Sequence, residues 1–284
     1  NWIYWPGEEA EKGKALKSET PPWLVATYSE TFSSRRVLQP SDRIGFQLAQ
    51  AAAHGALSCA ALNGVIQNQE DKRSLNSVDE HLATLASLKE YLVETKNPAK
   101  VALIFSPDSL WFGPDHGKQA GVIWGHQTEF RGLYKMLTHM RYPFAVHMTG
   151  MLSRDVLSAY DVVVLPAACC LADTDIQLLK GWVEDGGCLI STANSGQWDE
   201  NANIREQTSC LFPKFLAERN ATGGYLSITG NELVSYLGET SIVSIAETFW
   251  EIEVADEDQS KLNLIGPFTN NAPEFTYWND DDIG

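Results

Sequence analysis

The sequence predicts an α/β protein whose central layer is a doubly wound parallel sheet, and three observations support this prediction. Short apolar runs with strand character alternate with segments of helical periodicity along most of the 284-residue chain. The clearest of these runs are continuously apolar, as in strands that are buried on both faces. Capping residues, Gly and Pro separate the runs, so that a helix follows each strand before the next strand begins.

Residues 1–97 form the first predicted segment. Its expected elements are strands over residues 23–27 and 57–62, a helix over residues 42–54, and a second helix that begins at residue 77. Ser77 and Glu80 have the spacing of a capping box, in which the two side chains satisfy each other's backbone N–H groups. The Asn97-Pro98 pair ends the second helix and marks the predicted domain boundary.

Residues 98–284 form the second predicted domain, in which four strands are separated by helices. The expected strands cover residues 101–105, 144–148, 161–165 and 188–192. The helices between them cover residues 128–140, a short segment that Ser153 caps, and a segment that opens with capping-box spacing at Thr174 and Gln177. This alternation implies a flavodoxin-like sheet, with ligands expected beyond the carboxyl ends of its strands.

Other parts of the second domain are less regular. Residues 106–117 are expected to form a loop rich in Pro, Asp and Gly. Residues 212–219 are expected to form a helix, residues 242–254 have strand character, and residues 262–277 are expected to contain one or two further strands.

The charge of the chain excludes two classes of partner. Lys and Arg number 21 against 37 Asp and Glu, which gives a net charge of −16. A surface this acidic repels phosphate backbones and anionic lipids, so we expect neither nucleic acid nor a membrane as a partner. The longest apolar run, residues 162–172, is shorter than the roughly 20 residues that a membrane span needs.

The five cysteines indicate a reducing, cytoplasmic compartment. Their number is odd, they form no C-x-x-C pair, and most of them lie in apolar stretches, so we expect buried thiols instead of disulfides or a zinc site. The adjacent Cys169 and Cys170 are expected to fill core space, with a reactive pair as the alternative. The sequence contains no P-loop, G-x-G-x-x-G, H-E-x-x-H, EF-hand or G-x-S-x-G motif, and we expect no cofactor and no metal.

A nucleophile on the turn after the fourth strand is the first catalytic hypothesis to test. Amidotransferases with this type of sheet place a Cys on such a turn, with a His downstream as the base. Here the turn reads Ala193-Asn194-Ser195-Gly196, and no His follows His147. A Cys–His relay is therefore excluded in that arrangement, and Ser195 is interpreted as a turn residue.

Two loops of the second domain carry aromatic and acidic side chains that suit a sugar. The candidate substrate-binding residues are Trp111, Asp115, His126, Glu129, Trp198 and Asp199. Because both loops follow strands of a doubly wound sheet, we expect them at the same edge, where they could form one pocket. The alternative is that the tryptophans cover an interface with a neighbouring domain or subunit.

Several segments resemble the family 42 β-galactosidases and related barrel glycosidases. The segments are residues 47–56 (QLAQAAAHGA), 101–106 (VALIFS), 160–166 (YDVVVLP), 182–187 (WVEDGG), 188–192 (CLIST) and 196–200 (GQWDE). The resemblance implies that residues 1–97 are the last βα units of an incomplete (β/α)8 barrel. It also implies that residues 98–284 contain the family's class I glutamine amidotransferase-like trimerisation domain, which has lost its Cys nucleophile.

The resemblance implies that this chain serves in the assembly of the protein and does not catalyse hydrolysis by itself. A complete barrel needs about 200 residues, whereas 97 residues precede Pro98. The family's nucleophile ends the seventh barrel strand, where Glu30 is the nearest candidate. The alternative for Glu30 is a loop carboxylate that pairs with Arg35 or Arg36.

Two functional hypotheses therefore remain open. The first is a non-catalytic C-terminal portion of a glycoside hydrolase-like protein, which forms a homo-oligomer, a trimer by resemblance, and helps to shape a site for a carbohydrate ligand. The second is a small-molecule-binding or hydrolytic amidotransferase-like domain that uses the aromatic and acidic loops.

Overall fold

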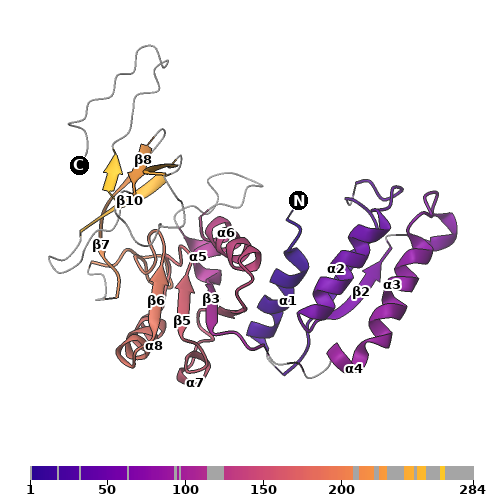
Figure 1. The fold of residues 1–284 in the computed structure, drawn as a ribbon, viewed down its shortest axis with the longest axis horizontal. Helices are drawn as coiled ribbons and strands as arrows, with labels where there is room; N and C mark the ends of the chain where they lie inside the picture. Colours follow the sequence, from indigo (N-terminus) through magenta and orange to yellow (C-terminus); the bar gives the residue numbers. More distant parts are fainter. Residues whose placement is uncertain are drawn as a thin grey trace, which may run out of the picture.

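A computed structural model of the chain describes residues 2–17, 19–31, 33–62, 64–92, 95, 97–113, 125–206, 211–220, 224–228, 240–245, 248–253 and 263–265. Figure 1 shows two groups of elements with helix α1 between them. A small strand pair with its helices lies on one side of α1, and a larger sheet covered by helices lies on the other.

The first group contains one pair of parallel strands and the helices around it. Its elements are α1 (Trp5–Leu16), β1 (Trp23–Thr27), α2 (Ser41–Ala53), β2 (Leu57–Ala61), a 3-10 turn (Ile66–Asn68), α3 (Leu75–Ser87) and α4 (Lys89–Leu92). Strands β1 and β2 pair in parallel over their whole length. Helices α1, α2 and α3 cover one face of the pair, where Leu24, Ala26, Ile44 and Val78 are buried.

The second group is a four-stranded parallel sheet, which confirms the α/β prediction. Its elements are β3 (Val101–Phe105), α5 (Pro107–Phe112), α6 (His126–His139), β4 (Phe144–Met148), α7 (Arg154–Leu157), β5 (Val162–Leu165), α8 (Asp173–Glu184) and β6 (Cys188–Ser191). The strand order is β4-β3-β5-β6. Helix α6 packs on one face through Phe130 and Tyr134, and helices α7 and α8 pack on the other through Leu157 and Leu179.

Helix α1 joins the two groups and was missed in the sequence. It packs against β4 on one side and against α2 on the other. Pro6 lies in its first turn, where proline suits a helix. The mean hydropathy of α1 is low and its apolar residues follow no clear helical stripe, so periodicity does not reveal it.

The remaining described strands are antiparallel. They are β7 (Lys214–Asn220), β8 (Gly224–Ser227), β9 (Ile242–Ile245), β10 (Thr248–Glu253) and β11 (Asn263–Ile265). The expected helix over residues 212–219 is wrong, because β7 pairs with β10 along its length. That pairing partner lies some thirty residues downstream, and its contacts override a local composition that a helix also tolerates.

Two predicted capping boxes are also wrong. Helix α3 begins at Leu75, so Ser77 lies within it and donates to the carbonyl of Ser74. Ser74 is itself held in place by its hydrogen bond to the carbonyl of Gln39, which fixes the start of the helix before the predicted cap. Helix α8 begins at Asp173, and no side chain caps it.

Two further local predictions have mixed outcomes. The cap at Ser153 is confirmed, because its Oγ accepts from the Val156 N–H at 3.2 Å. Part of the expected loop over residues 106–117 instead forms α5, which Ser106 caps and which has Pro107 in its first turn. Within the residues that the structure describes, no helix is long and apolar enough to cross a membrane.

Candidate functional site

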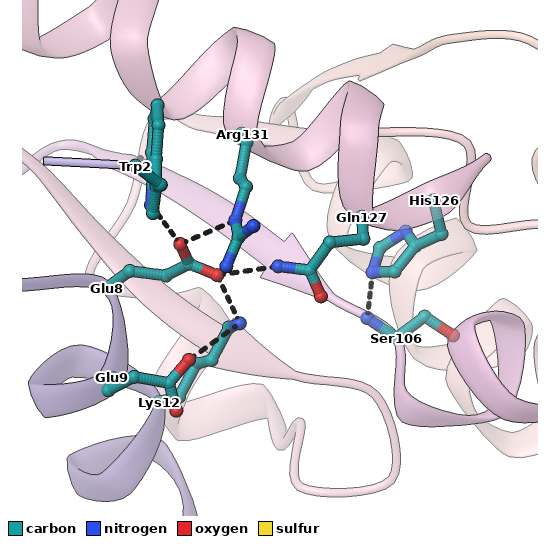
Figure 2. Close-up of polar contacts among 8 residues, drawn as sticks. All are labelled: Trp2, Glu8, Glu9, Lys12, Ser106, His126, Gln127 and Arg131. Carbon is teal, nitrogen blue, oxygen red and sulfur yellow. Dashed lines mark hydrogen bonds and ion pairs between the residues drawn. The ribbon is translucent and has the colours of Figure 1, made fainter. Parts of the chain in front are cut away.

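His126 lies at the carboxyl edge of the four-stranded sheet, where the sequence predicts a site. It begins α6, and only 3% of its surface is exposed. Its Nε2 accepts from the Ser106 N–H at 2.7 Å, as Figure 2 shows, and its Nδ1 donates to the Pro166 carbonyl at 2.6 Å. Burial lowers the pKa of His126 to about 4, so the imidazole is neutral at physiological pH. His126 thus ties the ends of β3 and β5 together, with both ring nitrogens occupied.

A second polar network lies beside His126 and involves the two adjacent cysteines. Ser106 Oγ donates to the Cys170 carbonyl at 3.1 Å, and Ser109 Oγ accepts from the Cys170 N–H at 2.9 Å. The Sγ atoms of Cys169 and Cys170 are 3.9 Å apart, and both residues are buried. The pair fills core space, as expected.

Not all described cysteines are buried. Cys59 is half-buried and Cys188 is exposed at the start of β6, which is an edge strand of the four-stranded sheet. The expectation of mostly buried thiols is therefore wrong for Cys188, because an edge strand leaves alternate side chains open to solvent. All four described cysteines are free thiols. Cys210 lies outside the described residues.

The turn after β6 holds no nucleophile. Ala193 adopts a positive φ of 48°, a strained conformation for a residue with a side chain. Ser195 is 1% exposed, and its Oγ accepts from the Ala168 N–H and donates to the Leu165 carbonyl. Its hydroxyl is therefore used within the turn, which supports the interpretation of Ser195 as a turn residue.

The predicted aromatic and acidic residues lie on segments that both contact Cys170, which bonds Ser109 of α5 and forms a β-bridge with Trp198. Trp198 is half-buried, its N–H donates to the Cys169 carbonyl, and its ring lies 6.3 Å from that of Trp250. The carboxylate of Asp199 accepts from the N–H groups of its own loop, at residues 201 and 203. Trp111 is 59% exposed on α5, and Glu129 is half-buried in the first turn of α6.

The role of these residues in binding stays a prediction. Backbone groups bond both ring nitrogens of His126 and the carboxylate of Asp199, while Trp111 is exposed and Glu129 and Trp198 are half-buried. Asp115, the remaining member of the predicted set, lies outside the described residues.

Glu30 lies on the loop after β1 and forms an ion pair. Its Oε1 accepts from Arg43 Nη1 at 2.6 Å, and both side chains are about one third exposed. The loop-carboxylate interpretation is thus supported, although the partner shown is Arg43 on α2 and not one of the two arginines named from the sequence. The role of Glu30 as a nucleophile stays a prediction.

A buried charge cluster between α1 and α6 was missed in the sequence. Figure 2 shows four side chains that converge on the carboxylate of Glu8, which is fully buried. They are Lys12, Trp2, Gln127 at 2.7 Å and Arg131 at 2.9 Å. The spacing of Glu8 and Lys12, four residues apart, was the available signal, because such pairs face each other on a helix.

The Glu8 cluster serves as a structural connection. A carboxylate accepts about four hydrogen bonds, and the donors around Glu8 supply that number. The Lys12 ammonium also lies 4.0 Å from the centre of the Phe105 ring, where the aromatic face stabilises it. The cluster holds α1 against α6 and has no acceptor capacity left for a substrate.

No metal centre is formed by the described part of the chain. Within that part, no group of three or more His, Cys, Asp or Glu side chains is placed to hold a metal ion.

Comparison with known proteins identifies the second group of elements. Residues 99–213 match the protein family described as the beta-galactosidase trimerisation domain. The resemblance that the sequence motifs indicated is thus confirmed for these residues. Among curated proteins, no relative matches the sequence.

Solved structures share the fold over nearly the whole chain. Gan42B, a GH42 beta-galactosidase from G. stearothermophilus, has a TM-score of 0.71 at 18% identity over 96% of this chain. The beta-galactosidase from Rahnella sp. R3 has a TM-score of 0.69 at 19% identity over 92% of the chain. An alpha-L-fucosidase from Paenibacillus thiaminolyticus has a TM-score of 0.66 at 15% identity over 94%. The matches cover 41%, 41% and 38% of those chains, so this chain spans about 40% of their length.

Proposed function

We propose that this chain is part of a GH42 β-galactosidase-like protein and that residues 99–213 assemble it into a homo-oligomer, a trimer. The match of these residues to the trimerisation domain family carries the proposal. The occupied side chains at the sheet edge support it, because neither His126 nor Ser195 is available for catalysis. The role of the domain is then assembly, together with shaping a site for a sugar.

We also propose that β1 and β2 are the last two strands of a (β/α)8 barrel, with residue 97 at the junction to the next domain. The two strands are parallel, and helices cover only one of their faces. The other face exposes apolar side chains, with Trp23 72%, Val25 42% and Leu57 56% exposed. The interior of a barrel is filled by such side chains from all eight strands, which explains their exposure on an isolated pair.

The oligomeric state of the purified chain tests the assembly role. Size-exclusion chromatography with light scattering at micromolar concentration should give three times the chain mass of 31.4 kDa. A monomer under these conditions would overturn the proposal.

Activity of the purified chain tests the expected lack of turnover. Hydrolysis of nitrophenyl β-galactoside should stay at the level of the buffer. Turnover that is lost in a Glu30→Gln variant would instead establish catalysis by this chain and identify its nucleophile.

A second candidate function, ligand binding at the aromatic and acidic loops, rests on the exposure of Trp111 at the sheet edge. Tryptophan stacks well on sugar rings because its large face is apolar. Titration of tryptophan fluorescence with galactose, fucose and glutamine tests this function. The absence of any response to the three compounds would exclude it.

A further inference from the structure

A cavity of about 770 Å³ lies where α1, α2 and α4 meet the end of α6 and the start of β4. Its volume is within the range of small-molecule sites, about 300–1,000 Å³. Aromatic side chains form much of its wall, namely Tyr4, Phe46, Tyr91, Tyr134, Tyr142 and Phe144. The cavity lies toward the opposite end of α6 from His126 and shares no side chain with the residues discussed for the sheet edge.

Charged groups lie in the cavity beside these rings. Glu11 on α1 accepts from Lys14 Nζ at 2.8 Å and pairs with His54 Nδ1 at 2.9 Å. Burial alone would raise the pKa of Glu11, but the hydrogen bonds from His54 and Lys14 outweigh it and lower the pKa. The carboxylate is therefore ionised at neutral pH, with its charge matched inside the cavity.

The hydroxyl of Tyr134 supplies a further polar group. The Tyr134 ring packs edge-on against Phe144 at 4.8 Å, and its hydroxyl has no hydrogen-bond partner among the described residues. Burial raises the pKa of Tyr134, so the hydroxyl remains a protonated donor. A Cβ at Gly7 would come within 2.8 Å of both this hydroxyl and the His54 ring, so glycine allows α1 to approach both side chains closely.

From this arrangement we propose that the cavity binds a neutral sugar, of the size of a hexose or a disaccharide. Aromatic faces accommodate the C–H faces of a pyranose ring, while the Glu11 carboxylate, the Lys14 ammonium and the Tyr134 hydroxyl exchange hydrogen bonds with its hydroxyl groups. The internal pairing of Glu11 leaves little charge to attract an ion. An anion would also meet the net charge of −16, and a cation would meet Lys14 and Arg141.

Titration calorimetry and saturation-transfer NMR on the purified chain test the proposal, with galactose and lactose as probes and glycerol as the control. Saturable millimolar binding of a sugar, but not of glycerol, is expected. No saturable binding of either sugar, or equal binding of glycerol, would overturn the proposal.

Two variants locate the binding in this cavity. Tyr134→Phe should weaken binding about three- to tenfold, the effect of one hydrogen bond, and leave the unfolding temperature unchanged because the hydroxyl has no partner among the described residues. Tyr91→Ala should weaken sugar binding at least as much, because it removes one of the aromatic rings that line the cavity. Because Tyr91 is 77% exposed, folding should be unaffected. The matched control Tyr28→Phe removes a hydroxyl outside the cavity and should leave affinity unchanged.

Affinities that are equal in the wild type and in both variants would place the sugar elsewhere and overturn the proposal. The inference does not depend on the assembly role proposed above. Light scattering of the same samples reports the oligomeric state, so a failure of either proposal is recognised separately.

Discussion

At the scale of single residues, Glu8 and His126 show two ways in which a buried polar group is accommodated. Glu8 keeps its carboxylate because charged and neutral donors from α1 and α6 surround it. His126 instead bonds two backbone groups that come from the ends of different strands. Both residues connect segments far apart in the sequence, so changing either one should affect stability more than surface substitutions do.

Replacing Glu8 by glutamine should destabilise the protein by about 3–5 kcal/mol, because the nearly buried Lys12 would lose its closer anion and keep only the longer contact to Glu9. Urea unfolding measures this change in the free energy of unfolding. The control Glu184→Gln removes an exposed carboxylate 3.9 Å from Lys180 and should cost less than about 0.5 kcal/mol. A loss below about 1 kcal/mol for Glu8→Gln would show that the cluster does not hold α1 in place.

The pKa of His126 predicts a loss of stability in mild acid. Its pKa is lowered from 6.5 to about 4 in the folded state, so the unfolded chain binds a proton more readily. Above pH 6.5 protonation of His126 does not affect stability. As the pH falls toward 4, the free energy of unfolding decreases by about 3 kcal/mol in total. Urea unfolding of the wild type and of His126→Gln at several pH values in this window measures it.

The stability of the His126→Gln variant should depend less steeply on pH than that of the wild type. Parallel pH dependences for the wild type and His126→Gln would contradict the assigned role of the buried imidazole.

The sequence predicts the edge of the sheet at which His126 lies, but it does not predict the two backbone groups that its imidazole bonds. The strands on either side predict the position, because loops after parallel strands meet at one edge. The partners of the imidazole, at residues 106 and 166, are backbone groups that any residue could supply. Side-chain patterns therefore carry no signal for these backbone partners.

At the scale of elements, Gly181 within helix α8 and Gly187, which lies between α8 and β6, have contrasting surroundings. Gly181 lies inside α8 with open space where a Cβ would be, so Gly181→Ala should raise stability by about 0.5–1 kcal/mol through helix propensity. At Gly187 an added Cβ would lie 2.3 Å from the Trp182 ring, so Gly187→Ala should destabilise by about 1–3 kcal/mol. Thermal unfolding of the two variants measures both effects, and equal shifts in the same direction would contradict this packing.

The strands of the large sheet were predictable because their apolar runs are continuous and short. The strand over residues 101–105, for example, has the bounds expected from its sequence. Element ends and the C-terminal strands were less predictable, because they depend on partners distant in sequence. The start of α3 follows the tertiary contact of Ser74, and β7 is a strand because β10 lies beside it.

At the scale of the whole molecule, α1 packs against both groups of elements. It lies between the strand pair and the large sheet in Figure 1, where it packs against α2 and β4. The Glu8 cluster connects it to α6, and the cavity beside Glu11 and Tyr134 borders it where residues of α2, α6 and β4 surround it. A change in the position of α1 would therefore alter both the junction between the two groups and the proposed sugar site.

The last prediction concerns the exposed apolar side chains on the uncovered face of β1 and β2. The effect of substituting them should depend on whether further strands cover that face. On this chain Trp23→Thr should change the free energy of unfolding by less than about 0.5 kcal/mol, because the side chain is 72% exposed. It should also reduce the binding of a dye that reports apolar surface. Leu24→Ala, on the covered face of the same strand, should cost about 2–5 kcal/mol.

In a longer protein with a complete barrel, Trp23 would be an interior side chain, and its substitution should become as costly as that of Leu24. Measuring Trp23→Thr in both contexts therefore tests the proposed barrel without an activity assay. Equal, small effects in the short and the long protein would show that this face stays open to solvent. The barrel assignment would then be wrong, even if residues 99–213 assemble as proposed.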